Sequence, residues 1–321
     1  INKTETGQTC ELKELSKNDL MEGDVTIKVE YSTLNYKDGL ALTGKSPVVR
    51  KFPLTPGIDF SGTVTNSDHT GFEAGDKVVL NGFGVGEVHS GGYAQMARVS
   101  GDWLVKLPSK IDARQAMAIG TAGYTAMLCV MALEQHGVKP ADGNILVTGA
   151  SGGVGSVAVA ILSKLGYSVV ATTGRMAEKD YLMSLGASEV IERQGFSEKA
   201  RALYKELWAG AIDVAGGNTL ANVLSQMKYG SAVAACGLAE SMNLPTSVAP
   251  FILRGITLYG VDSVMASIEK RQQAWSRLER DLDMDLLERL SFDLDFNDLP
   301  QAAIDILDGK IRGRAIVKIP T

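Results

Sequence analysis

Cysteine is scarce in this sequence. The 321 residues contain three, Cys10, Cys129 and Cys236, and none of them stands in a CxxC motif. Cys129 and Cys236 fall within apolar runs that predict a helix and a strand. We therefore expect buried, reduced thiols instead of a disulfide or a metal site.

Long hydrophobic runs and basic stripes are absent as well. No stretch reaches the ~18 uninterrupted apolar residues of a membrane-spanning helix, and the opening INKTETGQTC lacks the apolar core of a signal peptide. The 32 Lys and Arg residues are scattered, and the formal net charge is −5. We expect a cytoplasmic protein that binds neither a membrane nor a nucleic acid.

Length and texture predict two domains. The chain is longer than the ~250–300 residues at which a single core stops growing. Residues 21–119 carry short alternating segments separated by glycine-rich turns, which predict a compact β domain. From about Met117 to residue 263, strand and helix patterns alternate, which predicts a doubly wound parallel sheet of about six strands, and thus an α/β fold.

The C-terminal region departs from this alternation. After Ser263 comes a helical stretch of alternating charge, IEKRQQAWSRLERDLD, which we interpret as a solvated face. A helix near 297–308 and a final strand, GRAIVKI, follow, and we expect this strand to return to the first domain. The expected division is therefore 1–119, a central domain at 120–263, and a return at 264–321.

A glycine-rich turn follows the first strand of the central domain. The strand ILVTG leads into an apolar helix, and the glycines follow GxxGxxG spacing instead of GxGxxG. Backbone N–H groups in such a turn can approach a pyrophosphate, and the helix N-terminus adds partial positive charge. We predict that Ser151, Gly152, Gly153 and Val154 bind a dinucleotide; a turn that only packs strand against helix is the alternative.

The end of the next strand indicates which dinucleotide. An NAD-selective site places Asp or Glu about 20 residues beyond the glycines, where it binds the ribose 2′-hydroxyl. This chain has Thr173, Gly174 and Arg175 there, and Glu178 comes a turn later. A hydroxyl and a guanidinium suit a 2′-phosphate, so we predict NADPH. The alternative is that Arg175 only caps or solvates the next helix.

Seven short segments resemble the medium-chain dehydrogenase/reductase superfamily over nearly the whole chain. They are LNYKD (34–38), PGIDFSG (56–62), GDKVV (75–79), GGYAQ (91–95), GTAGYTA (120–126), VTGASGGVG (147–155) and GRAIVK (313–318). TAGYTAMLCVMALE, WAGAIDVAGG and PFILRGITLYGVDSV are similar to its YhdH/AcuI-type branch of quinone oxidoreductase-like proteins. The resemblance implies a Rossmann domain inserted in a GroES-like, mainly β catalytic domain.

Zinc-dependent relatives carry a cysteine ligand in the early loop and Gly-His-Glu in the later one. This chain has Asn35 to Asp38 and Gly57-Ile58-Asp59 there, and it lacks the four-cysteine lobe. Its three histidines are far apart in sequence and show no ligand spacing. We therefore expect no metal.

The resemblance implies NADPH-dependent reduction of acryloyl-CoA to propanoyl-CoA. Without a Lewis acid, hydride addition to the β-carbon of an activated alkene is favoured when nearby donors stabilise the charge on the carbonyl. A reductase of quinones or enals and a non-catalytic NADPH-binding sensor remain the alternatives.

Tyr36 is the predicted catalytic residue, placed beside the nicotinamide to orient it or donate a proton. A tyrosine packed at a domain seam is the alternative. We expect Asn35 and Asp38 to organise the loop.

Further residues are expected around the two ligands. Leu238, Ile252 in a predicted loop at 250–253, and Ser263 are expected to line the nicotinamide end. Phosphates of CoA or NADPH could meet basic residues, although simple solvent exposure is the alternative for each. These residues are Lys45, Arg50, Lys51, Arg312 and Arg314. The segment 255–263 predicts an edge strand through which a homodimer forms.

Overall fold

The computed structural model describes residues 1–320, and these form two compact units. The first unit contains Ile1–Thr121, Ser263–Glu279 and the segment that begins at Leu287, and the second contains Ala122–Asp262 and Arg280–Leu286. The second unit is thus inserted into the first along the chain. The sequence predicted domain boundaries after residues 119 and 263. It did not predict that residues 280–286 belong to the second unit.

The second unit is built on a six-stranded sheet in which every pairing is parallel. The strands follow the order β10-β9-β8-β11-β12-β13. They are β8 (Ile145–Val147), β9 (Val169–Thr173), β10 (Glu189–Glu192), β11 (Trp208–Asp213), β12 (Met227–Ala235) and β13 (Thr257–Gly260). The chain starts at the centre and winds outward first one way and then the other. The predicted doubly wound sheet is confirmed.

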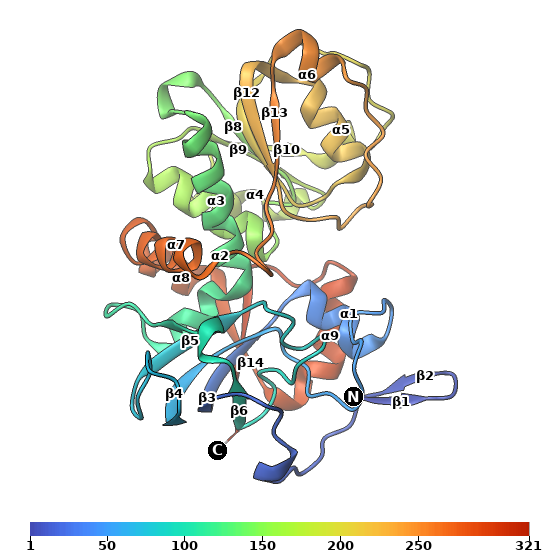
Figure 1. Ribbon diagram of the computed structural model, residues 1–321. Coiled ribbons are helices and arrows are strands. Elements are labelled where there is room, and N and C mark those ends of the chain that lie inside the picture. The colour runs from blue at the N-terminus through green and yellow to red at the C-terminus, as the bar shows by residue number, and fades with distance from the viewer. Residues whose placement is uncertain (321) are drawn as a thin grey trace. The chain divides into compact units, whose positions relative to one another are not determined.

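Helices connect these strands and cover the sheet (Figure 1). They are α3 (Gly153–Lys164), α4 (Lys179–Ser184), α5 (Gly217–Ser225) and α6 (Ala249–Arg254), with short 3-10 turns at Pro140–Asp142, Met176–Glu178 and Arg193–Phe196. The sequence prediction of a loop at 250–253 is wrong, because these residues lie in α6. Pro250 stands in the first turn of that helix, where a missing N–H costs no hydrogen bond.

The first unit is built on a mainly antiparallel seven-stranded sheet. Its strands follow the order β14-β15-β3-β4-β5-β7, and β6 pairs with β3. They are β3 (Val25–Leu34), β4 (Asp59–Ser67), β5 (Lys77–Asn81), β6 (Met96–Val99), β7 (Val105–Lys106), β14 (Ser291–Leu294) and β15 (Arg314–Lys318). Since β15 pairs with β3, the last strand returns to the first unit, as the sequence predicted.

Alternating apolar side chains of this sheet form the core of the first unit. Val25, Ile27 and Val29 point to one face of β3 and are buried together with Phe60 of β4.

The remaining elements are β1 (Asn2–Thr4), β2 (Gly7–Thr9), α1 (Tyr36–Thr43), α7 (Ile268–Asp281), α8 (Met284–Leu290) and α9 (Leu299–Leu307), with 3-10 turns at Lys17–Asp19, Gly101–Trp103 and Phe296–Asp298.

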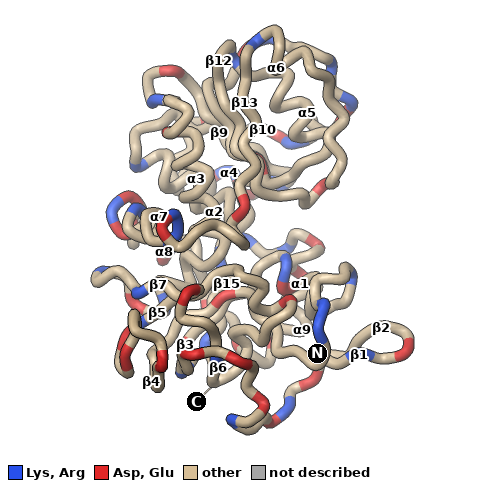
Figure 2. The backbone as a smooth tube through the Cα atoms, in the orientation of Figure 1, with Lys and Arg blue, Asp and Glu red and all other residues tan. Residues whose placement is uncertain are grey.

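The charged helix α7 is only partly a solvated face. Lys and Arg positions alternate with Asp and Glu along it (Figure 2). Arg271, however, is 1% exposed, and its guanidinium donates to the carbonyls of Asn81, Ser263 and Val264 while lying over the Phe83 ring. The sequence-based interpretation is therefore wrong for this residue, because backbone carbonyls in the adjacent loops provide acceptors for a buried cation.

The long helix α2 (Ala113–His136) bends at Gly120, whose φ of +52° lies in the left-handed region. It is the single helix within residues 1–320 that is long and apolar enough to cross a membrane. In the structure, 89% of its most apolar window is buried, which is the usual condition of a core helix.

Close packing of β3 against β4 generates a stability prediction. A Cβ added to Gly62 of β4 would clash with the backbone carbonyl of Lys28 on β3, and backbone cannot swing aside. We expect Gly62→Ala to lower the free energy of unfolding by about 1–3 kcal/mol.

Urea denaturation followed by tryptophan fluorescence measures this change. Gly195→Ala is the matched control, because a Cβ there meets nothing within 4 Å. Equal denaturation midpoints for the two variants would contradict the packing argument.

Candidate functional site

A tight turn joins β8 to α3 at the carboxyl edge of the parallel sheet. Gly149 has a φ of +56°, and the N–H of Gly152 donates to its carbonyl at 3.0 Å. A Cβ on Gly155 would lie 2.6 Å from Cα of Ala150, so only glycine lets the helix approach the turn this closely. Gly152 caps α3 without a side-chain acceptor, which leaves the first N–H groups of the helix available to an anion.

The predicted 2′-phosphate residues gather at the end of β9. Thr173 is buried, and its Oγ1 accepts the N–H of Arg175 at 3.1 Å and lies 3.4 Å from Oγ of Ser151. Nη2 of Arg175 donates to the same Ser151 hydroxyl at 3.4 Å. The structure therefore brings Ser151, Thr173 and Arg175 together beside the glycine turn.

A second guanidinium lies at this place, and sequence reasoning missed it. Arg193 packs over Gly174 so closely that an added Cβ would meet its Nη2 at 3.2 Å and its Cζ at 3.3 Å. The position follows from strand pairing, because Glu192 of β10 lies opposite Thr173 of β9. An arginine immediately after the neighbouring parallel strand was the available signal. Two guanidiniums and a hydroxyl here fit a phosphate group well.

Of the two apolar residues predicted at the nicotinamide end, only Leu238 lies at this edge of the sheet: it follows β12 and is 60% exposed. Ile252 is 73% exposed, but it lies in the last turn of α6, which leads into the amino end of β13 and whose Arg254 donates to the carbonyls of Ser225 and Met227, so its predicted place is wrong. Exposed aliphatic side chains of this size suit a planar ring or another protein surface. Ser263, also predicted at the nicotinamide end, belongs to the first unit, where its carbonyl accepts Nη2 of Arg271 at 3.0 Å. Its role beside a coenzyme stays a prediction.

The first unit contains a buried polar network at the start of α1. Asn35 caps the helix, and Asp38 accepts its backbone N–H at 2.9 Å and its side-chain amide at 3.1 Å. The Asn35 amide also donates to Asp59 at 3.0 Å, and Asp59 accepts Oγ1 of Thr33 at 2.8 Å and the N–H of Thr121 at 2.7 Å. Asn35 and Asp38 thus organise the loop, as predicted.

Two buried carboxyl groups share this network with one buried guanidinium. Burial and the neighbouring Asp59 raise the pKa of Asp38 to about 7. Burial lowers the pKa of Arg314, which Asp59 and Asp38 oppose. Each group is kept in place by hydrogen bonds, which is the condition for tolerating charge in a protein interior.

The prediction that Arg314 binds a ligand phosphate is wrong. Arg314 is 2% exposed, and it donates to the carbonyl of Ala118 at 3.0 Å and to Oδ1 of Asn35 at 3.2 Å. Its side chain points into the sheet, where the carboxylate of Asp59 provides the opposite charge. A free surface phosphate cannot reach it.

Tyr36 and the predicted basic cluster lie near the start of the same helix in sequence. Tyr36 is the first residue of α1 and is 44% exposed, so its phenol is accessible. Lys37 and Arg50 both pair with Glu87, at 2.9 Å and 3.1 Å. Arg50 remains largely exposed and Lys45 is exposed. A phosphate can thus reach both cations, although Arg50 already has a carboxylate partner.

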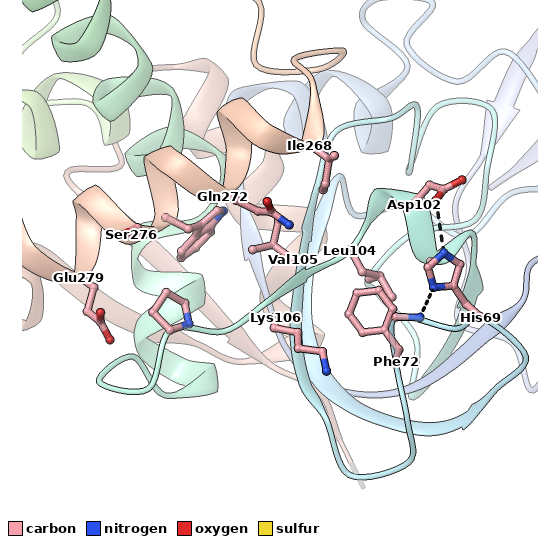
Figure 3. A pocket seen from close by; sticks show the side chains of 14 residues that line it. His69, Phe72, Asp102, Leu104, Val105, Lys106, Ile268, Gln272, Ser276 and Glu279 are labelled. Atoms are coloured by element: carbon pink, nitrogen blue, oxygen red, sulfur yellow. Dashed lines mark hydrogen bonds and ion pairs between the residues drawn. The ribbon is translucent and has the colours of Figure 1, made fainter.

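A pocket of about 670 Å³ lies in the first unit, between α7 and the loops around β7 (Figure 3). None of the predicted site residues lines it. His69 uses both ring nitrogens there, since Nδ1 accepts the N–H of Gly71 at 3.0 Å and Nε2 lies 3.3 Å from Asp102. The pocket is therefore separate from the residues that fit a dinucleotide.

Known proteins resemble this chain along nearly its whole length. Residues 21–109 match the family described as alcohol dehydrogenase GroES-like domain, and residues 153–280 match zinc-binding dehydrogenase. The protein named "Probable acrylyl-CoA reductase AcuI" of Escherichia coli is 56% identical over 305 residues, 95% of this chain and 94% of that protein. Acrylyl-CoA reductase AcuI of Ruegeria pomeroyi is 55% identical over 317 residues, 98% and 96% of the two chains. This chain belongs to the AcuI branch of the medium-chain dehydrogenase/reductases.

A solved structure extends the likeness to three dimensions. The crystal structure of Escherichia coli YhdH with bound NADPH has a TM-score of 0.97 and 54% identity, and covers 99% of this chain and 98% of that chain. The expected Rossmann and GroES-like domains of the AcuI-type fold are therefore confirmed.

Zinc, which one family description implies, does not fit the residues of this AcuI-type chain. Within residues 1–320, no three His, Cys, Asp or Glu side chains are placed to hold a metal ion. Asp38 and Asp59 accept N–H and O–H donors instead, as the network above shows. The ring nitrogens of His89 contact the carbonyls of Ser90 and Glu22, and those of His136 contact Tyr259 and Gly230.

The three cysteines of the AcuI-type chain are free thiols. Cys129 is buried in α2, as predicted, and Cys236 is half-buried just after β12. Cys10 is exposed, so the expectation of burial is wrong for this residue. Its neighbours are polar, and nothing apolar in the sequence draws it inward.

The arrangement at β9 predicts coenzyme preference. Arg175→Ala removes a charged donor from the phosphate end, so we expect the Kd for NADP⁺ to rise about 10- to 100-fold while the Kd for NAD⁺ stays nearly unchanged. Isothermal titration calorimetry measures both constants.

Arg201→Ala is the control, because Arg201 lies over the Tyr204 ring elsewhere in the second unit. If Arg175→Ala leaves the ratio of the two dissociation constants as in wild type, the phosphate assignment fails.

Proposed function

We propose that this chain catalyses the NADPH-dependent reduction of a short enoyl-CoA, with acryloyl-CoA converted to propanoyl-CoA. One observation carries the proposal: two proteins named acrylyl-CoA reductase are 55–56% identical to it over 95–98% of its length. Such identity over nearly the full length of both chains supports a common substrate class.

NADPH is the proposed coenzyme on the evidence of the second unit. Arg175, Arg193 and Thr173 collect hydrogen-bond donors at the end of β9, and no acidic side chain follows Thr173 before Glu178. A carboxylate at this edge would repel a 2′-phosphate, whereas guanidinium groups attract one. The crystal structure of Escherichia coli YhdH with bound NADPH supports the same choice.

The residues of the chain have distinct proposed roles. When bound, NADPH supplies the hydride that adds to the β-carbon of the activated alkene. The glycine turn of Ser151 to Val154 holds the pyrophosphate, and Leu238 and Ser263 line the nicotinamide end. Tyr36, accessible at the start of α1, orients the ligands or donates the proton that the α-carbon requires.

The phosphates of CoA are proposed to meet the exposed cations of the first unit. Lys45 is exposed, and Arg50 keeps most of its surface open while pairing with Glu87. An exposed ion pair of this kind contributes little to stability, so a phosphate can compete for the guanidinium. Arg314 has no part in this role because it is buried.

A substrate panel tests the proposed function. Oxidation of NADPH is followed at 340 nm with acryloyl-CoA, longer enoyl-CoA esters, a simple quinone and acrolein. We expect the highest kcat/KM with acryloyl-CoA. A preference for the quinone or for acrolein would favour the quinone or enal reductase, and binding of NADPH with no turnover of any acceptor would favour a sensor.

Tyr36 carries a separate prediction. Tyr36→Phe keeps the ring and removes the hydroxyl, so we expect kcat to fall about 100-fold or more if the phenol donates the proton. Steady-state kinetics at saturating NADPH measures this fall. Tyr229→Phe is the control, since Tyr229 is an exposed surface tyrosine. An unchanged kcat would exclude the proton-donor role.

A homodimer through β13 in the cytoplasm completes the proposal. Strand β13 pairs only with β12 in the described sheet, so its outer edge is open to a second copy. The free thiols fit a reducing compartment, where acyl-CoA esters and NADPH are both available.

The exposed end of β13 allows this assembly to be tested. A side chain at Gly260 would meet nothing within 4 Å in one chain, but in a dimer paired along β13 a charge there would lie against the edge strand of the second copy. We expect Gly260→Lys to shift sedimentation from dimer to monomer. Gly195→Lys, also in open space, should remain dimeric. A monomeric wild-type protein at working concentration would contradict the dimer.

A further inference from the structure

A buried carboxylate lies at the carboxyl end of β11 and has no role in the site described above. Asp213 is fully buried. Its Oδ1 accepts the hydroxyl of Thr148 at 2.7 Å, and its Oδ2 accepts the N–H of Gly216 at 2.8 Å. The Thr148 oxygen in turn accepts the N–H of Val214 at 3.0 Å. Both carboxylate oxygens are thus committed to donors on two different loops.

These contacts join the loop after β8 to the loop after β11. Thr148 directly precedes Gly149, the left-handed residue of the glycine turn. A Cβ on Gly149 would lie 2.5 Å from Cγ2 of Val214, so the two loops touch at this residue. Thr148 and Asp213 hold Val214 in place. Val214 therefore limits the space that the glycine turn can occupy.

The same residue also reaches the loop after β12. The backbone carbonyl of Asp213 accepts the N–H of Cys236 at 2.9 Å and lies 3.5 Å from its Sγ. Gly237 packs directly against the carbonyl of Val214. Leu238, proposed at the nicotinamide end, follows immediately. Asp213 is thus bonded to the three loops that follow β8, β11 and β12.

We propose that Asp213 is a positioning residue for the coenzyme: through Thr148 it holds the glycine turn, and through its neighbours it holds the Cys236–Leu238 loop, in the arrangement that binds NADPH. The inference rests on the proposed coenzyme, and not on the acceptor. It requires no contact between Asp213 and the coenzyme.

The charge of Asp213 matters because every described partner of its side chain is a donor. Burial raises its pKa to about 6, and Glu240 of the loop after β12 acts in the same direction. The thiols of Cys129 and Cys236 are the other titratable groups near it. Below this pH a proton occupies one oxygen, which then cannot accept from Thr148 or Gly216. Coenzyme affinity should therefore fall as the pH falls through about 6.

Matched variants test the inference by calorimetric titration of the full-length protein with NADP⁺. Asp213→Asn replaces one carboxylate oxygen by an NH₂ group, which cannot accept the hydrogen bond that Thr148 or Gly216 donates. We therefore expect the Kd to rise about tenfold or more. Thr148→Val should do the same because it removes the hydroxyl, whereas Thr148→Ser keeps the hydroxyl and should restore near-wild-type affinity. Ser225→Ala, which removes another buried hydroxyl of this unit, should leave the Kd unchanged.

A pH series separates positioning from a purely structural role. The ratio of the Asp213→Asn Kd to the wild-type Kd should shrink between about pH 8 and pH 5, as Asp213 becomes protonated in the wild type. Titration of the coenzyme 2′-phosphate near pH 6 affects both proteins equally and cancels in the ratio.

Four outcomes decide between the proposals. An unchanged Kd in Asp213→Asn with a lowered melting temperature, or equal effects of Thr148→Val and Thr148→Ser, would overturn the positioning role. Absence of NADP⁺ binding by the wild type would overturn it together with the proposed coenzyme. The expected Kd pattern in a protein that does not reduce acryloyl-CoA would support the positioning role while the proposed function fails.

Discussion

The parallel register of the second unit is the constraint on which the coenzyme site depends. Pairing of β9 with β10 places Thr173 opposite Glu192, so the arginines that follow these strands emerge side by side. Pairing of β8 with β11 places Val147 opposite Ile212, so Thr148 and Asp213 meet one residue later. Since parallel strands end at one edge, residues far apart in sequence converge there without any long side chain having to reach across.

The first unit depends on a different device, a buried polar network at the start of α1. Removing carboxylates and a guanidinium from water is costly, and the cost is offset here because nearly every oxygen has a donor. Asn35 connects the helix start to Asp59 of β4 and to Arg314 of β15. The network therefore fixes Tyr36 at the first turn of a helix whose N-cap side chain is bonded to two strands of the sheet.

The residues at the positions of the zinc ligands have other roles in this chain. The positions that hold cysteine and histidine in zinc-dependent relatives hold Asn35 and Ile58 here, and these belong to the hydrogen-bond network and to the core. The same backbone positions that carry ligands elsewhere thus contribute to stability and to the placement of Tyr36.

Local signals were sufficient for the fold and for the residues that lie next to one another in sequence. Strand–helix alternation predicted the doubly wound sheet, and the glycine turn and Thr173-Gly174-Arg175 were found because each is a short contiguous motif with its own chemistry. Side-chain environment was decided by tertiary structure. Arg314 and Arg271 are basic residues that composition assigns to the surface, yet both are buried because acceptors from distant segments surround them.

The sequence by itself predicted two domains, a dinucleotide turn and a strand end suited to a 2′-phosphate, since those predictions depend on periodicity and neighbouring residues. Only the tertiary structure decided that Arg193 joins Arg175 and that Asp213 joins Thr148. The physical reason is that strand order and register, which set both pairs, arise from long-range pairing that no single segment encodes.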